Sequence, residues 1–322
     1  MKVIAALALV VLALPALAQP SFDCAKASTV VERTVCKNAD LGKADREMAA
    51  LYFALNGRLT GPAKDHLLKD QVRWNGNRAA ACTTELEQCL QDKYTSRIKR
   101  LKFLGTGTYP FISDQAIVRT GKVRAITYAI DASYPQFDGP GVDFSAVNAE
   151  FANGARKGAA SAVPDKDAGD FEQTWGFDLR FVLHRPAPNL VAVEFFNYSY
   201  TGGAHGNGGT SASLVDLRTG RSVPPSSVFA TGDEWRRTVA ALVLADLKKQ
   251  FVDKPGFDEA IEPANLAKLL RDSTRWLFKA GGLTVIFNAY DVGPYAAGSY
   301  DVDIPYASLR PVMRPDAPLG SR

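Results

Sequence analysis

The chain has 322 residues, of which 46% are hydrophobic and 22% are charged. Such a composition is that of a globular protein long enough to bury one or two cores, and it excludes disordered and collagen-like chains. The net charge of +4 is spread along the chain without a block of Lys or Arg. Because this balance lacks the electrostatic footprint of nucleic-acid binding, nucleic acid is not expected as a partner.

The first 18 residues have the pattern of a secretory signal peptide. Lys2 precedes an apolar run over residues 3–14, and the small residues around 16–18 form a cleavage site. A membrane-spanning helix needs about 18 or more apolar residues, so this run is too short to be an anchor. We therefore expect cleavage near Ala18, no membrane span, and a periplasmic or secreted protein.

All four cysteines lie in the first third of the chain, at Cys24, Cys36, Cys82 and Cys89. An even number of cysteines in an exported protein indicates disulfides. Three connectivities are open, and the short spacings favour the local pairs, Cys24 with Cys36 and Cys82 with Cys89. The spacings are longer than the two to four residues of a zinc knuckle, so a metal site is not expected here.

From residue 21 to about residue 104, apolar side chains recur every three or four positions. This period predicts a short helix near 28–37 and three longer antiparallel helices. We expect breaks at Asn56-Gly57 and at Gly61-Pro62. Gln71 and Trp74 share one helical face, and they are expected to pack between helices against two tyrosines, Tyr52 and Tyr94. The segment has a net charge of +5.

Beyond Gly105 the apolar pattern changes to the period of strands. Strands are expected at 118–132, 177–183, 190–200, 276–279, 283–290 and 300–304, and helices at 142–160 and 235–251. Because these elements come in runs, we expect an α+β domain with a mainly antiparallel sheet and helices on one face. The predicted organisation is a signal peptide (1–18), a disulfide-stapled antiparallel helical domain (19–104), the α+β domain (105–312) and a loose tail (313–322).

No catalytic constellation assembles from the sequence, so neither an enzyme nor a cofactor is expected. The three histidines fall in three different elements, which does not make the ligand set of a catalytic zinc: His66, His184 and His205. A Gly-x-Ser-x-Gly nucleophile motif is absent from the sequence. The glycine-rich run at 202–209 lacks the Lys of a phosphate-binding loop and is interpreted as a loop between strands. Asp301 and Asp303 are interpreted as solvated surface charges.

Two segments have the composition of recognition loops. In 197–206, Tyr198 and Tyr200 share a strand face before a glycine turn, and in 290–298 a Pro-Tyr pair lies at a loop tip. Tyrosine gives a large, rigid contact surface, although hairpin turns with packed aromatics would look the same. The candidate partner-binding residues are Tyr200, Thr201, Gly202, Gly203, His205, Pro294, Tyr295 and Ala296.

The helical segment also carries a recurring order of Cys, Trp and Tyr residues. Its motif comprises Ser21 to Ala27, Val35-Cys36, Leu41-x-x-x-Asp45, Tyr52, Gln71-x-x-Trp74, Arg78, Cys82, Cys89-Leu90, Tyr94, Arg97, Ile98 and Leu101. Over residues 21–104 this pattern resembles the family of the lysozyme inhibitor LprI. The resemblance implies a lysozyme-type muramidase as partner.

The second domain carries three further motifs, which are strongest in its last third. They are Tyr200-Thr201-Gly202-Gly203-Ala204-His205-Gly206, the stretch from Leu283 to Gly298, and Val302-x-Ile304-Pro305-Tyr306. Over residues 115–312 the domain resembles one shared by the lysozyme-sensing anti-sigma factor RsiV and the peptidoglycan deacetylase PdaC. The sigma-binding region and the metal-dependent deacetylase domain of these relatives are missing, so the resemblance implies a recognition module alone.

Together the two resemblances imply an exported protein that binds lysozyme-type muramidases. It would inhibit them by inserting the loop 291–298, with Pro294 and Tyr295 at its tip, into the substrate cleft. The residues beyond the helical segment and the signal peptide have a net charge of only −2, so affinity should come from burial of the loop. The alternatives are a peptidoglycan-binding or glycan-binding module and an accessory to a cell-wall enzyme.

Overall fold

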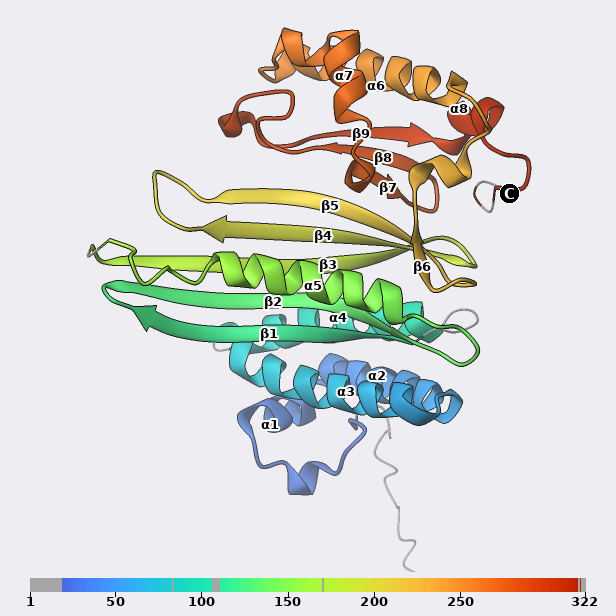
Figure 1. Cartoon of the computed structure of the whole chain (residues 1–322). Helices are drawn as coiled ribbons and strands as arrows, with labels where there is room; N and C mark the ends of the chain where they lie inside the picture. Colours follow the sequence, from blue (N-terminus) through green and yellow to red (C-terminus); the bar gives the residue numbers. More distant parts are fainter. Residues whose placement is uncertain (1–18, 83, 106–110, 170, 318, 320–322) are drawn as a thin grey trace, which may run out of the picture. The chain divides into compact units, whose positions relative to one another are not determined.

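The computed structural model describes residues 19–82, 84–105, 111–169, 171–317 and 319 (Figure 1). The chain folds as two compact units that divide between residues 107 and 108. The predicted signal peptide lies outside the described residues. Within the described ranges, no helix is long and apolar enough to cross a bilayer.

The first unit is helical, as the apolar period predicts. It contains a short 3-10 turn, η1 (Cys24–Lys26), and the helices α1 (Val30–Lys37), α2 (Ala39–Arg58), α3 (Gly61–Ala81) and α4 (Leu86–Gly105). The expected break at Asn56-Gly57 is wrong, because α2 continues through it to Arg58. The chain breaks instead at residues 59–60, and Gly61 opens α3 with a left-handed φ of +54°. The proline that follows loses nothing at a helix start, where its missing N–H would have no partner.

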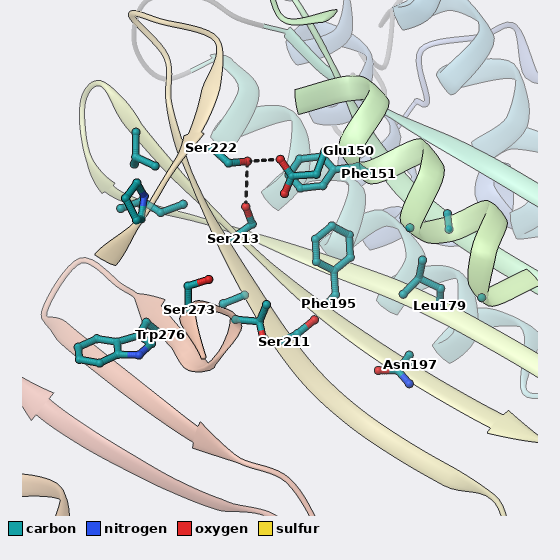
Figure 2. Close-up of a pocket in the computed structure, with 18 of the residues that line it drawn as sticks. Glu150, Phe151, Leu179, Phe195, Asn197, Ser211, Ser213, Ser222, Ser273 and Trp276 are labelled. Atoms are coloured by element: carbon teal, nitrogen blue, oxygen red, sulfur yellow. Dashed lines mark hydrogen bonds between the residues drawn. The ribbon is translucent and has the colours of Figure 1, made fainter. Parts of the chain in front are cut away.

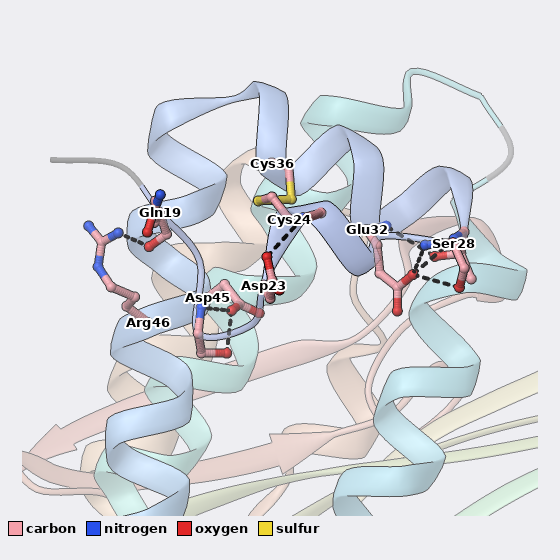
Figure 3. Close-up of a disulfide and its surroundings, with 11 residues drawn as sticks. Gln19, Asp23, Cys24, Ser28, Glu32, Cys36, Asp45 and Arg46 are labelled. Carbon is pink, nitrogen blue, oxygen red and sulfur yellow. Dashed lines mark hydrogen bonds between the residues drawn. A yellow bond between two sulfur atoms is a disulfide. The ribbon is translucent and has the colours of Figure 1, made fainter. Parts of the chain in front are cut away.

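A capping box begins α1. The hydroxyl of Thr29 accepts a hydrogen bond from the Glu32 N–H at 3.1 Å, and the Glu32 carboxylate accepts from the Thr29 N–H at 2.9 Å. The same carboxylate accepts from the N–H of Ser28 at 2.8 Å (Figure 3). These backbone N–H groups favour the charged form and lower the pKa of Glu32 from 4.5 to about 2.

Both disulfides lie in the helical unit. Cys24–Cys36 joins η1 to α1 with a Cα–Cα distance of 5.8 Å (Figure 3), and Cys82–Cys89 joins the end of α3 to α4 with a distance of 5.6 Å. They are the two local pairs that the spacing favours. Two disulfides in a small helical unit fit a protein that is exported to an oxidising compartment.

The helical unit has a polar network around Asp45, which is only 2% exposed. The Asp45 carboxylate accepts from the Tyr94 hydroxyl at 2.7 Å and from the N–H and hydroxyl of Ser21 at 2.7 and 2.5 Å. Arg78 donates to the same tyrosine oxygen. Burial raises the pKa of Tyr94, so its hydroxyl stays neutral and keeps the proton that it donates.

A second buried network links α3 to α4. Arg97 forms an ion pair of 2.7 Å with Asp70 and donates to the Gln71 amide oxygen at 2.8 and 3.2 Å. The expected contact of Trp74 with Tyr94 is present, with ring centroids 5.3 Å apart at an edge-to-face angle of 71°. The ring of Tyr52 instead contacts that of its neighbour in the chain, Phe53.

The second unit contains two sheets and four helices among its described residues (Figure 1). The larger sheet has its strands in sequence order: β1 (Phe111–Val123), β2 (Ile126–Asp138), β3 (Gln173–Ala187), β4 (Leu190–Tyr200), β5 (Asn207–Asp216) and β6 (Arg221–Val223). The smaller sheet is β7 (Trp276–Phe278), β8 (Gly282–Phe287) and β9 (Tyr300–Pro305). The helices are α5 (Ser145–Ser161), α6 (Glu234–Asp253), α7 (Pro263–Leu269) and α8 (Tyr306–Leu309).

All strand pairs are antiparallel except β2 and β3, which α5 joins by a crossover. The predicted α+β class is confirmed, with two differences in detail. The single strand expected at 118–132 is a hairpin, because Arg124 adopts a left-handed φ of +52° between β1 and β2. The strands β5 and β6 were not predicted, because their Gly, Ser and Thr residues give no apolar alternation.

Two apolar clusters stand out among the described residues of the second unit. The buried face of α5 packs on β2 and β3, where Ala155 and Ala159 meet Ile130 and Phe177. A larger core joins α6 to β7, β8 and β9 and also includes Met313 and Leu319. These two residues of the tail that was expected to be loose are therefore packed, whereas residues 314–316 between them are exposed.

Candidate functional site

The two segments with the composition of recognition loops lie against each other in the second unit. They are the β4–β5 turn (201–206) and the β8–β9 loop (288–299). The Tyr295 hydroxyl donates to the Gly206 carbonyl oxygen at 2.7 Å. Its ring also stacks on that of His205, with centroids 4.0 Å apart and planes 20° apart. We call this pair of segments the paired loops.

Asn288 ties the β8–β9 loop to the neighbouring strand β5. Its side-chain oxygen accepts from the Thr210 N–H at 2.7 Å, and its side-chain nitrogen donates to the Thr210 carbonyl at 3.0 Å. The Asp291 carboxylate accepts a hydrogen bond from the Asn288 N–H at 2.5 Å. It also forms an ion pair with the Arg275 guanidinium, one of whose nitrogens lies 2.9 Å from a carboxylate oxygen. The Arg275 and Asp291 side chains are only 13% and 19% exposed, so the loop is fixed from its inner side.

Tyr290 is the more exposed of the two tyrosines in the paired loops, at 56%. Its φ is +72°, a left-handed value that is uncommon for a bulky residue. The turn around it is closed by hydrogen bonds from the Tyr290 N–H to Gly293 and from the Asp291 N–H to Asn288, both 3.0 Å long. Strained residues of this kind cluster at functional sites, where the surrounding structure holds them.

The structure divides the aromatic roles in the β8–β9 loop differently from the sequence prediction. Tyr295 is half-buried and hydrogen-bonded, and its ring is tilted against Tyr290 with centroids 5.5 Å apart. Pro294 is also half-buried and precedes the 3-10 turn η5 (Tyr295–Ala297), while Ala296 is exposed. Tyr290 is part of the sequence motif but was not among the predicted site residues, because the sequence does not show which tyrosine is exposed.

The β4–β5 turn depends on glycine. Gly202 and Gly203 have φ values of +98° and +95°, which side-chain-bearing residues rarely adopt. The Tyr200 hydroxyl donates to the Gly203 carbonyl at 3.0 Å, which fixes the turn. Thr201 and His205 are exposed.

A groove of about 440 Å³ lies between β4, β5 and the β8–β9 loop. Phe196 and Tyr198 line it from the same face of β4, and they are 40% and 46% exposed. Asn288 and Tyr295 line it from the loop. Phe196 was not predicted as a site residue, although its i, i+2 spacing from Tyr198 places both rings on one strand face.

The chemistry of this surface is that of contact and hydrogen bonding. In the part of the chain that the structure describes, no group of three or more His, Cys, Asp or Glu residues could hold a metal ion. The paired loops instead offer aromatic rings, amides and hydroxyls on a backbone that is already fixed. Such a surface can bind a partner with little loss of conformational freedom.

Three segments of the chain match three different family models. Residues 23–101 match the family "Lysozyme inhibitor LprI". Residues 123–208 match the family "Deacetylase PdaC", and residues 226–307 match DUF3298, a family of unknown function. The predicted resemblances to LprI and PdaC are confirmed. The β4–β5 turn lies within the PdaC match, and the β8–β9 loop lies within the DUF3298 match.

Solved structures of two DUF3298 proteins are similar to part of the chain. A protein from Pseudomonas aeruginosa PAO1 is 19% identical, with a TM-score of 0.45, over 66% of this chain and 98% of that protein. A protein from Bacteroides fragilis NCTC 9343 is 18% identical, with a TM-score of 0.44, over 65% of this chain and 95% of that protein. Comparison with curated proteins found no match.

Proposed function

We propose that this protein is an exported, non-enzymatic binding protein for lysozyme-type muramidases. The observation that carries the proposal is the match of residues 23–101 to the lysozyme inhibitor family. The two disulfides support export, because they fit an oxidising compartment.

The paired loops of the second unit are the proposed contact surface. A lysozyme substrate cleft is a groove with two working carboxylates, and a rigid loop that enters it excludes the substrate. The loop 291–298 would enter this cleft with the adjacent Tyr290 ring leading, because this ring is exposed and its backbone is held. Pro294 and Tyr295 would brace it, since Tyr295 is tied to the β4–β5 turn. The fixed loop reduces the entropy lost on binding.

Electrostatic attraction contributes little to this proposed complex. The helical segment has a net charge of +5, and the residues beyond it have a net charge of −2. A basic lysozyme therefore meets no strong field of opposite sign, and affinity rests on burial of the aromatic surface. We expect the association rate to change little between low and physiological salt.

The test is binding of the full exported chain to immobilised hen-type lysozyme, measured by biolayer interferometry. Tyr290→Asn removes the ring while retaining a residue type that tolerates the left-handed backbone. We expect it to weaken binding about thirtyfold, which corresponds to about 2 kcal/mol. Phe53→Ala is the comparator, because Phe53 is 66% exposed on α2 in the helical unit.

The Phe53→Ala comparator shows which of the two units contacts lysozyme. Unchanged affinity with Phe53→Ala and loss with Tyr290→Asn support the paired loops. The reverse result places the contact on the helical unit, and an absence of binding by the wild type contradicts the whole proposal. Inhibition is measured as slower lysozyme-driven clearing of a cell-wall suspension, and it should fall in parallel with the affinity of each variant.

A further inference from the structure

The two edges of the larger sheet differ in how well they are protected. At one edge, the short strand β6 pairs with the end of β5, and β5 also contacts the 3-10 turn η4 (Ser273–Arg275) and β7. The cavity beside α5, of about 590 Å³, is lined from both sides of this contact, by Ser211 of β5 and by Ser273 and Trp276 (Figure 2). At the other edge, β1 is the end strand of the described sheet and pairs with β2 over 13 residues. A long end strand has outward N–H and C=O groups that can pair with another strand.

The side chains of β1 alternate between the two faces of the sheet. Arg119 lies on the face that α5 covers, because its guanidinium is 5.5 Å from the Tyr128 ring centroid and Tyr128 belongs to the apolar cluster under α5. Gly121 lies beside the same ring, where an added Cβ would collide with it. The even-numbered residues of β1 therefore lie on the opposite face. Among them is Val118, which is 73% exposed.

The charges of β1 limit how a second copy of the strand can pair with it. The strand has three charged residues, Asp114, Arg119 and Lys122. In an antiparallel pair only alternate residues turn their N–H and C=O groups toward the partner strand, so even-numbered residues must meet even-numbered ones. Asp114 can thus oppose Lys122 of a second copy, but it cannot oppose Arg119. Because a two-fold axis repeats each contact, this register contains the pair of opposite charges twice.

The same register places the two-fold axis on Val118. This residue lies midway between Asp114 and Lys122, so it meets its own copy. A β-branched pair at the centre and opposite charges at both ends are combinations that stabilise antiparallel sheets. We propose that β1 is a dimerisation edge, at which two copies of this chain pair through residues 114–122. The pairing joins two six-stranded sheets into one continuous sheet.

Other registers lose this complementarity. An axis on Arg119 opposes two like charges, and an axis on Ile117 leaves each charged residue opposite an uncharged one. The strand is therefore complementary to itself in one register, which is the property of a two-fold interface and is not expected of an edge for unrelated peptides. The inference goes beyond lysozyme binding and rests on different residues.

The experiment is sedimentation velocity of the full exported chain over a range of concentrations. We expect a weak dimer, because one strand pair is smaller than a standard interface. Lys122→Glu sets two carboxylates against each other at both ends of the pairing and should weaken the dimer at least tenfold. The charge-swapped double variant Asp114→Lys/Lys122→Glu should restore it. Lys157→Glu, which reverses an exposed charge on α5, is the matched control and should leave the dimer unchanged.

A second measurement, with Val118→Cys, tests the register directly. The introduced thiols would meet at the axis, where the Cα atoms of opposed residues lie about 4.5–5.5 Å apart, within the reach of a disulfide. Thr120→Cys is the control, because its two copies would lie roughly 13 Å apart along the strands. The four native cysteines are already paired in two disulfides. Mild oxidation should therefore cross-link the first variant and not the second.

Each measurement has an outcome that contradicts the dimer. The proposal is overturned by a wild type that stays monomeric up to about 1 mM. It is also overturned by a dimer that Lys122→Glu leaves intact, by a folded double variant that does not recover the dimer, or by cross-linking of Thr120→Cys in place of Val118→Cys. Lys122→Glu should retain lysozyme binding, and Tyr290→Asn should retain the dimer, so failure of this inference is distinguishable from failure of the proposed function.

Discussion

The two units place their family-matched residues in opposite environments. In the helical unit, four polar residues that carry the resemblance to LprI are buried. Asp45, Gln71, Tyr94 and Arg97 are each at most 9% exposed, and they bond to one another or to neighbouring helices. In the α+β unit, the matched segments include a loop whose leading ring, Tyr290, is 56% exposed.

This contrast separates two kinds of information in a sequence match. A pattern built from buried, hydrogen-bonded residues reports how a unit folds, and it does not locate a contact surface. A pattern built around fixed loops with an exposed ring is the basis of the contact surface that we propose. Variants of the helical network should therefore change stability, whereas variants of the paired loops should change binding.

The largest effect is expected from Arg97→Met, which breaks the buried ion pair with Asp70. Removal of one partner from such a pair typically costs about 3–5 kcal/mol, because a charge stays buried without its counter-ion. The free energy of unfolding of the helical unit is measured by urea titration followed by circular dichroism. Lys102→Met is the control, since it breaks an exposed pair with Glu47 and should cost less than about 1 kcal/mol. Equal losses in the two variants would remove the distinction between the buried network and the surface.

The next effect is expected from removal of a disulfide. The Cys24–Cys36 bridge spans 12 residues, and a loop of this length stabilises by about 3 kcal/mol in the chain-entropy account. The double variant Cys24→Ser/Cys36→Ser should lower the stability of the helical unit by about that amount and leave the α+β unit unchanged. Peptide mapping without reductant should recover both bridges from the wild type. Free thiols, or a mixed pairing of the four cysteines, would contradict the assignment.

A smaller effect is expected from Asp291→Asn, which tests the fixed loop without removing an exposed ring. The amide cannot form the ion pair with Arg275, so the β8–β9 loop becomes more mobile. We expect affinity for lysozyme to fall about tenfold, or about 1.4 kcal/mol. Hydrogen exchange of the loop amides should accelerate. Asp316→Asn, which breaks an exposed pair with Arg314, is the control and should change neither quantity. Unaltered exchange in Asp291→Asn would mean that the ion pair does not hold the loop.

The smallest effect concerns pH. The folded-state pKa of Glu32 is about 2, below its ordinary value of 4.5, so the unfolded chain binds more protons between these two values. The contribution of Glu32 is therefore complete above pH 4.5 and is lost as the pH falls toward 2. A carboxyl titration followed by NMR should give a midpoint near 2, and Glu32→Gln should remove this part of the acid sensitivity. A midpoint near 4.5 would show that the capping box is not formed in solution.

The fold was predictable where one side of an element is apolar and the other is polar. The helices α1 to α4 of the first unit and α5 and α6 of the second follow this pattern, whereas β4 was predicted from a run of apolar residues that are buried on both sides. The turn at Arg124 was missed because the apolar alternation continues after it in the sequence, so that the two strands look like one. β5 was missed because Gly208, Gly209 and the serines that follow them form a strand through backbone pairing with β4, not through apolar side chains.

The paired loops were predictable as segments but not as one surface. Tyrosine and glycine spacing identified both segments, whereas the hydrogen bond between Tyr295 and Gly206 joins residues 89 positions apart. Sequence spacing gives no signal for such a contact. The exposure of Tyr290 is equally hidden, because it follows from a left-handed backbone that the tyrosine type itself disfavours. The cavity beside α5 combines residues from several elements and had no sequence signal.

The strand order of the larger sheet has a consequence for how the protein matures. Every neighbouring pair from β1 to β6 is consecutive in the chain. A polypeptide that crosses a membrane from its N-terminus can therefore add each strand to the one that has just emerged, without waiting for distant segments. The paired loops are the exception, because Tyr295 reaches Gly206 only when the last tenth of the chain has been delivered. In the proposed export, the proposed contact surface would thus be completed last, after its supporting sheet.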